Sequence, residues 1–346
     1  MPKRTYNYLG EGNIAIDGPE EILARVERNL EEAPSNNPNY LGIVRVDKGS
    51  LVKVKKDKKY PYLWTRTNNS RNLEGVDYMR YDAHVQTVWK KSPREYEIIT
   101  NQGVDWNGAL DCLKKIYYDT KSSKKKTLIH GDLVNISGRG IFIVGECRSG
   151  KSTLLMNLLE NIGGVFVTGG NTLVENKGDR LTGFYLPRDV YLRFSSIAYS
   201  DRMFPSLGDV DSCEATQPID IEAIQSIIRA KAFHVDAGLN YSRERFAELM
   251  GIGKSVDSPI NKVIFVEYSN GSPLSLRTIS DEEALERLKR REFPKNTSLG
   301  EVRHQSEIQP PTKSLIKTNW FVNATPVLLS YHGNSDLTKN VLEDLV

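Results

Sequence analysis

The chain is poor in cysteine, carries little net charge and contains no hydrophobic run long enough to span a membrane. Its cysteines, Cys112, Cys147 and Cys213, are odd in number and far apart, which favours free thiols over a disulfide framework or a metal cluster. A formal net charge of +3 is too small to indicate a nucleic-acid or membrane partner by itself. Because the first residues also lack the apolar stretch of a signal peptide, we expect a cytoplasmic protein with no membrane contact.

The rest of the composition is that of a folded globular protein, with 39% hydrophobic and 26% charged residues. A chain of 346 residues is long enough for two domains. Residues 121–126 form a polar, basic stretch without hydrophobic periodicity, which indicates an exposed connection. We therefore expect one domain over 1–126 and a second over 127–346.

The first of these domains has the pattern of a small α+β unit. Apolar residues at helical spacing, with acids in the first turn, predict an amphipathic helix over 19–30. The apolar runs 41–46 and 51–55 flank a turn that contains Gly49, which predicts a β-hairpin. A second helix is predicted over 106–118 from its apolar spacing.

The second domain begins with a complete phosphate-binding sequence between a strand pattern and a helix pattern. The apolar run 140–144 predicts a strand buried on both faces, and leucines at helical spacing predict a helix over 154–159. The loop between them reads Gly145-Glu146-Cys147-Arg148-Ser149-Gly150-Lys151-Ser152-Thr153.

Each conserved chemical type in such a loop has a physical role. Gly145 and Gly150 bracket a turn whose backbone N–H groups converge on phosphate oxygens. Lys151 brings a positive charge to the β- and γ-phosphates, and the Ser152 hydroxyl can ligate Mg²⁺. The helix dipole adds to this attraction for anions. The sequence therefore predicts binding of ATP with Mg²⁺, while Cys147 is either a small filler of the loop or an oxidisable thiol.

Strands and helices alternate after the loop, which is typical of an α/β domain. Two strands, 164–168 and 172–175, are expected around a Gly169-Gly170 turn. A buried strand over 262–268 ends in an acid, and a polar connector over 294–313 precedes a helical tail. The predicted helices cover 219–231, 243–250, which Gly251 ends, and 281–291, with Ser280 as its N-cap.

The segment just before the loop carries the most specific resemblance. Residues 128–140 predict a strand that turns at Gly138-Arg139-Gly140 into the loop strand, so that His130 lies on an adjacent strand. From His130-Gly131 to Gly150-Lys151-Ser152, the chain resembles without gaps the nucleotide-binding segment of the HPr kinase/phosphorylase family. These are P-loop kinases related to phosphoenolpyruvate carboxykinase. The resemblance covers about thirty residues closely, follows only the order of elements to residue 294, and excludes the N-terminal domain.

The resemblance implies an HPr kinase-like α/β domain with a mixed sheet, preceded by the smaller α+β domain. It also implies homo-oligomers and an ATP-dependent kinase in which Mg²⁺ bridges the β- and γ-phosphates and a hydroxyl accepts the γ-phosphoryl group. In the family, the strand after the loop helix ends in acids that serve metal and base. This chain has Thr168-Gly169-Gly170-Asn171 there instead.

Several acids are candidates for the missing catalytic carboxylate. Asp132 lies two positions after His130 and therefore on the same side of its strand. Glu267 ends an apolar strand in the manner of a Walker B acid. Glu146, inside the loop, would repel phosphate unless it is directed at metal or acceptor. The remaining two, Glu175 and Asp179, follow the glycine turn.

Three further residues have two interpretations each. His130 either takes part in catalysis or makes a hydrogen bond that orients the loop. Arg188 and Arg193 either reach phosphate or substrate or are ordinary surface arginines.

The sequence does not identify the acceptor of the phosphoryl group. Residues Lys53–Trp64 interleave cations with aromatics and Lys121–Lys126 add a basic cluster, so both can follow a phosphate backbone, whereas a solvated hairpin with core aromatics is the ordinary explanation of the pattern. Some phage-type P-loop kinases phosphorylate hydroxymethylated DNA bases, which keeps a nucleic-acid component beside a protein or a metabolite as the hydroxyl-bearing acceptor. The N-terminal domain would choose it. The alternative from another class is a non-catalytic ATP-binding sensor or scaffold; no second signature motif supports a motor or transport ATPase.

Overall fold

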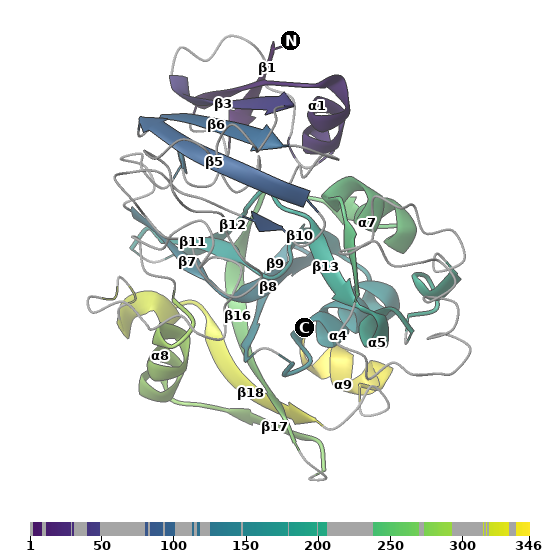
Figure 1. Cartoon of the computed structure of the whole chain (residues 1–346). Helices are drawn as coiled ribbons and strands as arrows, with labels where there is room; N and C mark the ends of the chain where they lie inside the picture. Colours follow the sequence, from purple (N-terminus) through teal and green to yellow (C-terminus); the bar gives the residue numbers. More distant parts are fainter. Residues whose placement is uncertain are drawn as a thin grey trace. The chain divides into compact units, whose positions relative to one another are not determined.

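The computed structural model divides into two compact units (Figure 1). One unit comprises residues 1–125 with 187–189 and 295–308, and the other comprises 126–186, 190–294 and 309–346. The structure describes residues 3–8, 12–28, 30, 40–48, 80–81, 84–92, 94–100, 113, 116–117, 125–146, 148–178, 180–198, 200–205, 238–269, 273–292, 314, 316, 318–331 and 337–346.

The N-terminal unit contains a mixed sheet whose described strands follow the order β1-β2-β3-β6-β5-β4. Helix α1 (Glu20–Glu27) connects two parallel strands, β2 and β3, and buries Leu23 and Val26 completely. It lies within the helix predicted over 19–30. The strands are β1 (Lys3–Tyr8), β2 (Gly12–Asp17), β3 (Tyr40–Lys48), β4 (Arg80–Tyr81), β5 (His84–Ser92) and β6 (Glu95–Thr100).

Polar contacts hold β1 against α1. Arg4 forms ion pairs with Glu20 and Glu27, one at each end of the helix, and the Tyr6 hydroxyl donates to Glu27 at 3.1 Å. Burial raises the pKa of Tyr6 well above its ordinary value, so this phenol stays protonated and keeps its donor. The predicted strand 41–46 lies inside β3, which pairs with β2 and β6. Its predicted hairpin partner, 51–55, lies outside the described residues.

The second unit contains a mixed sheet in the order β15-β10-β8-β9-β16-β12-β11-β7, with β18 joining β16 to β17. Strands β9, β16 and β18 run parallel to one another, whereas β8 is antiparallel to β9. The α/β class with a mixed sheet is therefore confirmed. The strands are β7 (Lys126–Ile129), β8 (Gly131–Ile136), β9 (Arg139–Gly145), β10 (Val165–Thr168), β11 (Thr172–Asn176), β12 (Leu181–Tyr185), β15 (Gly253–Lys254), β16 (Asp257–Tyr268), β17 (Ser275–Thr278) and β18 (Thr325–Tyr331), and a separate pair is formed by β13 (Val190–Arg193) and β14 (Gly238–Tyr241).

The Gly169-Gly170 segment bends the sheet and does not form a hairpin. Strands β10 and β11 lie on its two sides as predicted, but β10 pairs with β8 and β11 pairs with β7. Strand β7 continues directly into β8 at His130, and β10 continues into β11 at Gly169-Gly170. These two connections lie side by side where the chain passes from one part of the sheet to the other. Because pairing continues from β8 through β9, β16, β12 and β11 back to β7, the sheet curls.

Helices cover both faces of this curled sheet. On one face, Leu154 and Leu158 pack with Ile143 of β9, and on the other, Leu288 packs with Val144 of the same strand. Strand β9 is thus buried on both faces, as its unbroken apolar sequence predicts. The described helical segments are α4 (Lys151–Asn157), the π-helix η2 (Leu158–Ile162), α5 (Phe194–Ala198), α7 (Arg243–Met250), α8 (Asp281–Lys289), the 3-10 helix η4 (Thr318–Phe321) and α9 (Lys339–Asp344).

Local capping signals account for the helices whose bounds were predicted best. The Ser242 hydroxyl accepts a hydrogen bond from the backbone of α7 at 3.2 Å, and Gly251 ends that helix with a φ of 61°. Ser280 caps α8 in the same way, also at 3.2 Å. The helix predicted over 219–231 and the connector over 294–313 lie outside the described residues, and β18 was not predicted.

Within the described part of the chain, the helices are too short or too polar to cross a bilayer.

Candidate functional site

The phosphate loop connects the end of β9 to the start of α4, as its motif requires. Gly150 is the N-cap of α4 and has a φ of 96°, a conformation that strains any residue with a Cβ. A Cβ at Gly150 would also lie 2.1 Å from the Tyr331 hydroxyl. At Gly145 a Cβ would lie 2.6 Å from the carbonyl oxygen of Val266. Both bracketing glycines are therefore required by close contacts.

Two side chains hold the loop in shape. The buried Lys151 ammonium donates to the carbonyl oxygens of Gly145 at 3.0 Å and of Glu146 at 2.7 Å. From β18, the Tyr331 hydroxyl donates to the carbonyl oxygen of Gly150 at 2.7 Å. The loop is thus tied from inside by its own lysine and from outside by a neighbouring strand.

The hydroxyl residues of the loop lie at the start of α4, where the helix dipole favours anions. Ser149 is buried, and its Oγ has no hydrogen-bond partner within the described residues. Ser152 is half-buried in the first turn, and Thr153 Oγ1 lies 3.5 Å from Ser196 Oγ. Arg148 is exposed with a φ of 67°. Cys147 lies outside the described residues.

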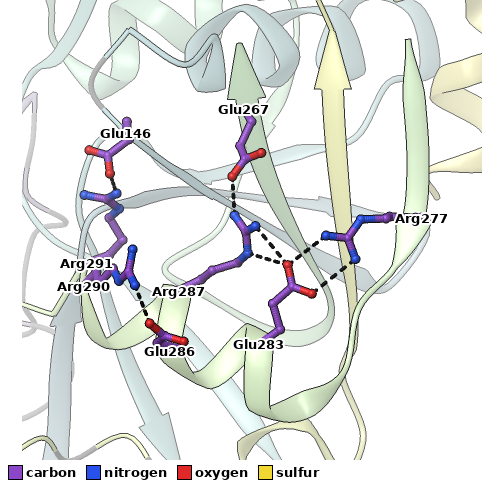
Figure 2. A network of polar contacts seen from close by, with 8 residues as sticks. All are labelled: Glu146, Glu267, Arg277, Glu283, Glu286, Arg287, Arg290 and Arg291. Atoms are coloured by element: carbon purple, nitrogen blue, oxygen red, sulfur yellow. Dashed lines mark hydrogen bonds and ion pairs between the residues drawn. The ribbon is translucent and has the colours of Figure 1, made fainter. Parts of the chain in front are cut away.

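The acid inside the loop points to an arginine. Glu146 forms an ion pair with Arg291, which follows α8 (Figure 2). Burial lowers the pKa of Arg291 below the ordinary arginine value, although the group stays charged at neutral pH. In the free loop, this ion pair offsets the negative charge of the Glu146 carboxylate.

His130 and Asp132 meet at Gly170. His130 Nδ1 lies 2.6 Å from the Gly170 carbonyl oxygen, and because a carbonyl only accepts, Nδ1 must carry the hydrogen in this contact. The backbone N–H of Gly170 donates to the buried Asp132 carboxylate. Gly131 N also donates to the Gly170 carbonyl oxygen at 3.2 Å. The fold thus places His130 and Asp132 at the Gly169-Gly170 bend.

The pairing of β8 with β9 places His130 and Asp132 near the start of the phosphate loop. Gly131 pairs with Val144, the last residue before Gly145, and Asp132 pairs with Ile143. Since directly paired residues share a face of the sheet, Asp132 lies on the face that packs against α4.

Glu267 lies on the other neighbour of β9. Val266 pairs with Gly145, so Glu267 follows the position directly beside the start of the loop, where a Walker B acid is expected. Its carboxylate is exposed and forms an ion pair with Arg287 of α8 (Figure 2). Side chains alternate along a strand, so Glu267 and Asp132 flank the loop strand from opposite faces and are not brought together.

The other candidates lie farther from this arrangement or cannot be placed. Glu175 of β11 is buried and pairs with Lys177 at 3.5 Å. Arg193 ends β13, and Arg188 belongs to the segment that clusters with the N-terminal unit. Asp179 and the basic-aromatic segment Lys53–Trp64 lie outside the described residues.

The basic cluster Lys121–Lys126 is not exposed throughout, which corrects the sequence interpretation. Lys126 begins β7 and is buried, with Nζ 4.3 Å from the centre of the Phe184 ring. A lysine stem packs well on apolar surface while its charge interacts with an aromatic face. Lys125 is exposed, and residues 121–124 lie outside the described residues.

Sequence reasoning missed Tyr331, Arg287 and Arg291. Tyr331 closely follows the apolar run Pro326–Leu329, which could have signalled a strand but not its contact with the loop. Arg287 and Arg291 are four residues apart, the spacing that places side chains on one helical face.

No protein-family model matches the chain, and no curated protein sequence matches it either. Among solved structures, the HPr(Ser) kinase/phosphatase from Coxiella burnetii is distantly similar, with 14% sequence identity and a TM-score of 0.29. The similarity covers 63% of this chain and 87% of that chain. A TM-score this low does not establish a common fold. Membership of that family stays a prediction from residues 130–152.

Proposed function

We propose that this chain is an ATP-dependent phosphotransferase that moves the γ-phosphoryl group of ATP to a hydroxyl group of an acceptor. The observation that carries the proposal is the register around β9. A glycine-bracketed loop with Lys151 follows this strand, and a carboxylate is found near the same end of each neighbouring strand, Asp132 on β8 and Glu267 on β16.

The loop has donors suited to the phosphates. Lys151 now donates to two loop carbonyls, and in the proposed complex its ammonium takes phosphate oxygens as better, charged acceptors. The buried Ser149 hydroxyl, which has no hydrogen-bond partner within the described part of the chain, is a further donor of suitable position. The N-terminal amides of α4 complete the anion site.

The residues present also suit Mg²⁺, provided that the nucleotide supplies ligands. No group of three histidine, cysteine or acidic side chains within the described residues could hold a metal alone. Mg²⁺ beside a nucleotide usually takes one or two protein ligands together with phosphate oxygens and waters. Ser152 and one of the flanking acids would provide these ligands. When bound, Mg²⁺ neutralises charge on the phosphates.

We assign the proton-accepting role to Asp132. Its carboxylate is held by the Gly170 amide and lies beside His130, so its position is fixed before an acceptor arrives. His130 orients the same bend through the Gly170 carbonyl. Glu267, which pairs with Arg287, supports the metal in this assignment.

Isosteric variants test the assignment. Asp132→Asn should lower transfer from ATP to the acceptor by at least about a hundredfold while leaving ATP affinity within about threefold, because a lost base affects the chemical step. Glu267→Gln should instead raise the Mg²⁺ concentration that half-maximal transfer requires, because the metal loses the carboxylate that supports it. Lys339→Ala, an exposed lysine of α9, serves as a control. If Asp132→Asn transfers phosphate at the wild-type rate, Asp132 is not the proton acceptor.

A non-catalytic ATP sensor is the second candidate, because both flanking acids already have partners within the protein. It predicts ATP binding without hydrolysis and without transfer to any acceptor. A nucleic-acid acceptor remains a variant of the main proposal, and it predicts DNA binding whose affinity falls steeply with salt. Protein or metabolite acceptors predict no such binding.

A further inference from the structure

The end of α8 is fixed beside the phosphate loop by the backbone. The carbonyl oxygen of Arg291 accepts from His130 N at 3.0 Å, and Glu292 forms an isolated β-bridge with Ile129. Both contacts join the chain after α8 to the bend that leads into β8. The Cα of Arg291 is therefore held in place independently of its side chain.

The side chain of Arg291 is mostly buried, in contrast to its neighbour. Arg291 is 19% exposed and its partner Glu146 is 70% exposed, so a desolvated cation is paired with a carboxylate that keeps most of its water. One residue earlier, Arg290 is 65% exposed and pairs with Glu286 on the same helix. Burying a guanidinium costs free energy unless strong partners compensate it. One solvated carboxylate compensates it only partly.

A second arginine extends this arrangement. Arg287 lies one helical turn before Arg291 and pairs with Glu267, at the end of β16, and with Glu283 of α8 (Figure 2). Arg287 in the last turn of α8 and Arg291, two residues beyond its end, thus direct two cations at acids that lie where β9 and β16 end. Among the described residues, Arg287 pairs with two carboxylates and Arg291 with one.

Lys151 and Arg291 both contact Glu146. The lysine ammonium contacts the carbonyl oxygens of Gly145 and Glu146, and the arginine guanidinium contacts the Glu146 side chain. Two cations from different elements therefore converge on the first turn of the phosphate loop. In loops of this type the lysine reaches the β- and γ-phosphates of the nucleotide, so Arg291 is directed at a part of the loop that this lysine also contacts.

We propose that Arg291 is the second phosphate-binding cation of the site and exchanges Glu146 for the terminal phosphate of ATP. The inference rests on the proposed nucleotide binding. A guanidinium donates with both arms to a phosphate as it does to a carboxylate, and the terminal phosphate of ATP carries more negative charge than the Glu146 carboxylate. Glu146 is then a stand-in anion that holds Arg291 in the free protein and is released on binding. Because ADP lacks the terminal phosphate, Arg291 discriminates between ATP and ADP.

Calorimetric titration of the Mg²⁺ complexes of ATP and ADP tests this role. Arg291→Gln should weaken ATP binding by about tenfold or more, the effect of one lost hydrogen bond to a charged group, and ADP binding by less than about twofold. Arg290→Gln, one residue earlier and solvent-exposed, should change neither affinity. Equal weakening of ATP and ADP by Arg291→Gln, or no weakening at all, would overturn the proposal.

Glu146→Gln tests the exchange without removing the arginine. It removes a competing anion, so ATP affinity should rise by a few fold while ADP affinity stays constant. Unchanged or weaker ATP binding by Glu146→Gln would contradict the exchange, and this variant decides the matter if Arg291→Gln does not fold. A wild-type chain that shows this selectivity but transfers no phosphate would refute the phosphotransferase and keep the inference. If the wild-type chain transfers phosphate but Arg291→Gln keeps the wild-type preference for ATP over ADP, the phosphotransferase proposal stands and the inference about Arg291 is wrong. A wild-type chain that binds neither nucleotide would overturn both.

Discussion

Removal of the Tyr331 hydroxyl should loosen the phosphate loop without disturbing the core. The hydroxyl donates to the Gly150 carbonyl oxygen at 2.7 Å, and the ring belongs to the core cluster that contains α4. Tyr331→Phe keeps the ring and removes one hydrogen bond of a largely buried group, which contributes about 1 kcal/mol. For a unit of this size, the melting temperature should fall by about 2–4 °C.

Nucleotide affinity should fall together with stability in this variant. If the tether holds the loop in its binding-competent shape, a loss of about 1 kcal/mol weakens binding about fivefold. ATP and ADP should be affected equally, because the tether acts on the whole loop, and this distinguishes Tyr331 from Arg291. Calorimetric titration and thermal unfolding are the assays.

The matched control is Tyr268→Phe. Tyr268 pairs with Tyr331 in the register of β16 and β18 but is exposed, so its hydroxyl should matter little. If Tyr331→Phe binds both nucleotides as tightly as the wild type, the tether has no part in shaping the loop. A selective loss of ATP affinity would contradict the reasoning as well.

Two further predictions concern the frame of the site. Gly145→Ala places a Cβ 2.6 Å from the Val266 carbonyl oxygen, so it should lower the free energy of unfolding by about 1–3 kcal/mol in denaturant titrations; unchanged stability would show that the sheet can shift there. The hydrogen bond from Arg277 lowers the pKa of Glu283, and a second one, from Arg287, acts in the same direction. A lowered folded pKa stabilises the protein above the ordinary glutamate value of about 4.3, and this stability is lost as the pH falls through the folded pKa. Glu283→Gln should therefore flatten the loss of stability in acid, and an unaltered pH profile would rule out this contribution.

The sequence predicted those parts of the fold that local chemistry determines. Gly251 ends α7 and Ser280 marks the start of α8 as predicted, because capping hydrogen bonds join residues close in the chain. The strand, loop and helix around residues 140–159 were also recognised, because each element carries its own pattern.

The features that the sequence could not predict depend on contacts between residues far apart in the chain. The Gly169-Gly170 segment has the composition of a hairpin turn, yet strand pairing with β8 and β7 makes it a bend. Tyr331 reaches Gly150 across 181 positions, and the contact between Glu146 and Arg291 also joins remote parts of the chain. No periodicity or spacing encodes such contacts, so the polar partners of the loop became visible only in the fold.

Transfer from ATP labelled at a single phosphorus tests the central claim most directly. Wild-type protein should move label from γ-labelled ATP, and none from α-labelled ATP, to a hydroxyl-bearing acceptor. Lys151→Ala should abolish this transfer, while Lys339→Ala should not. Transfer by Lys151→Ala at the wild-type rate, or transfer of the α label, would contradict a phosphotransferase that uses this loop.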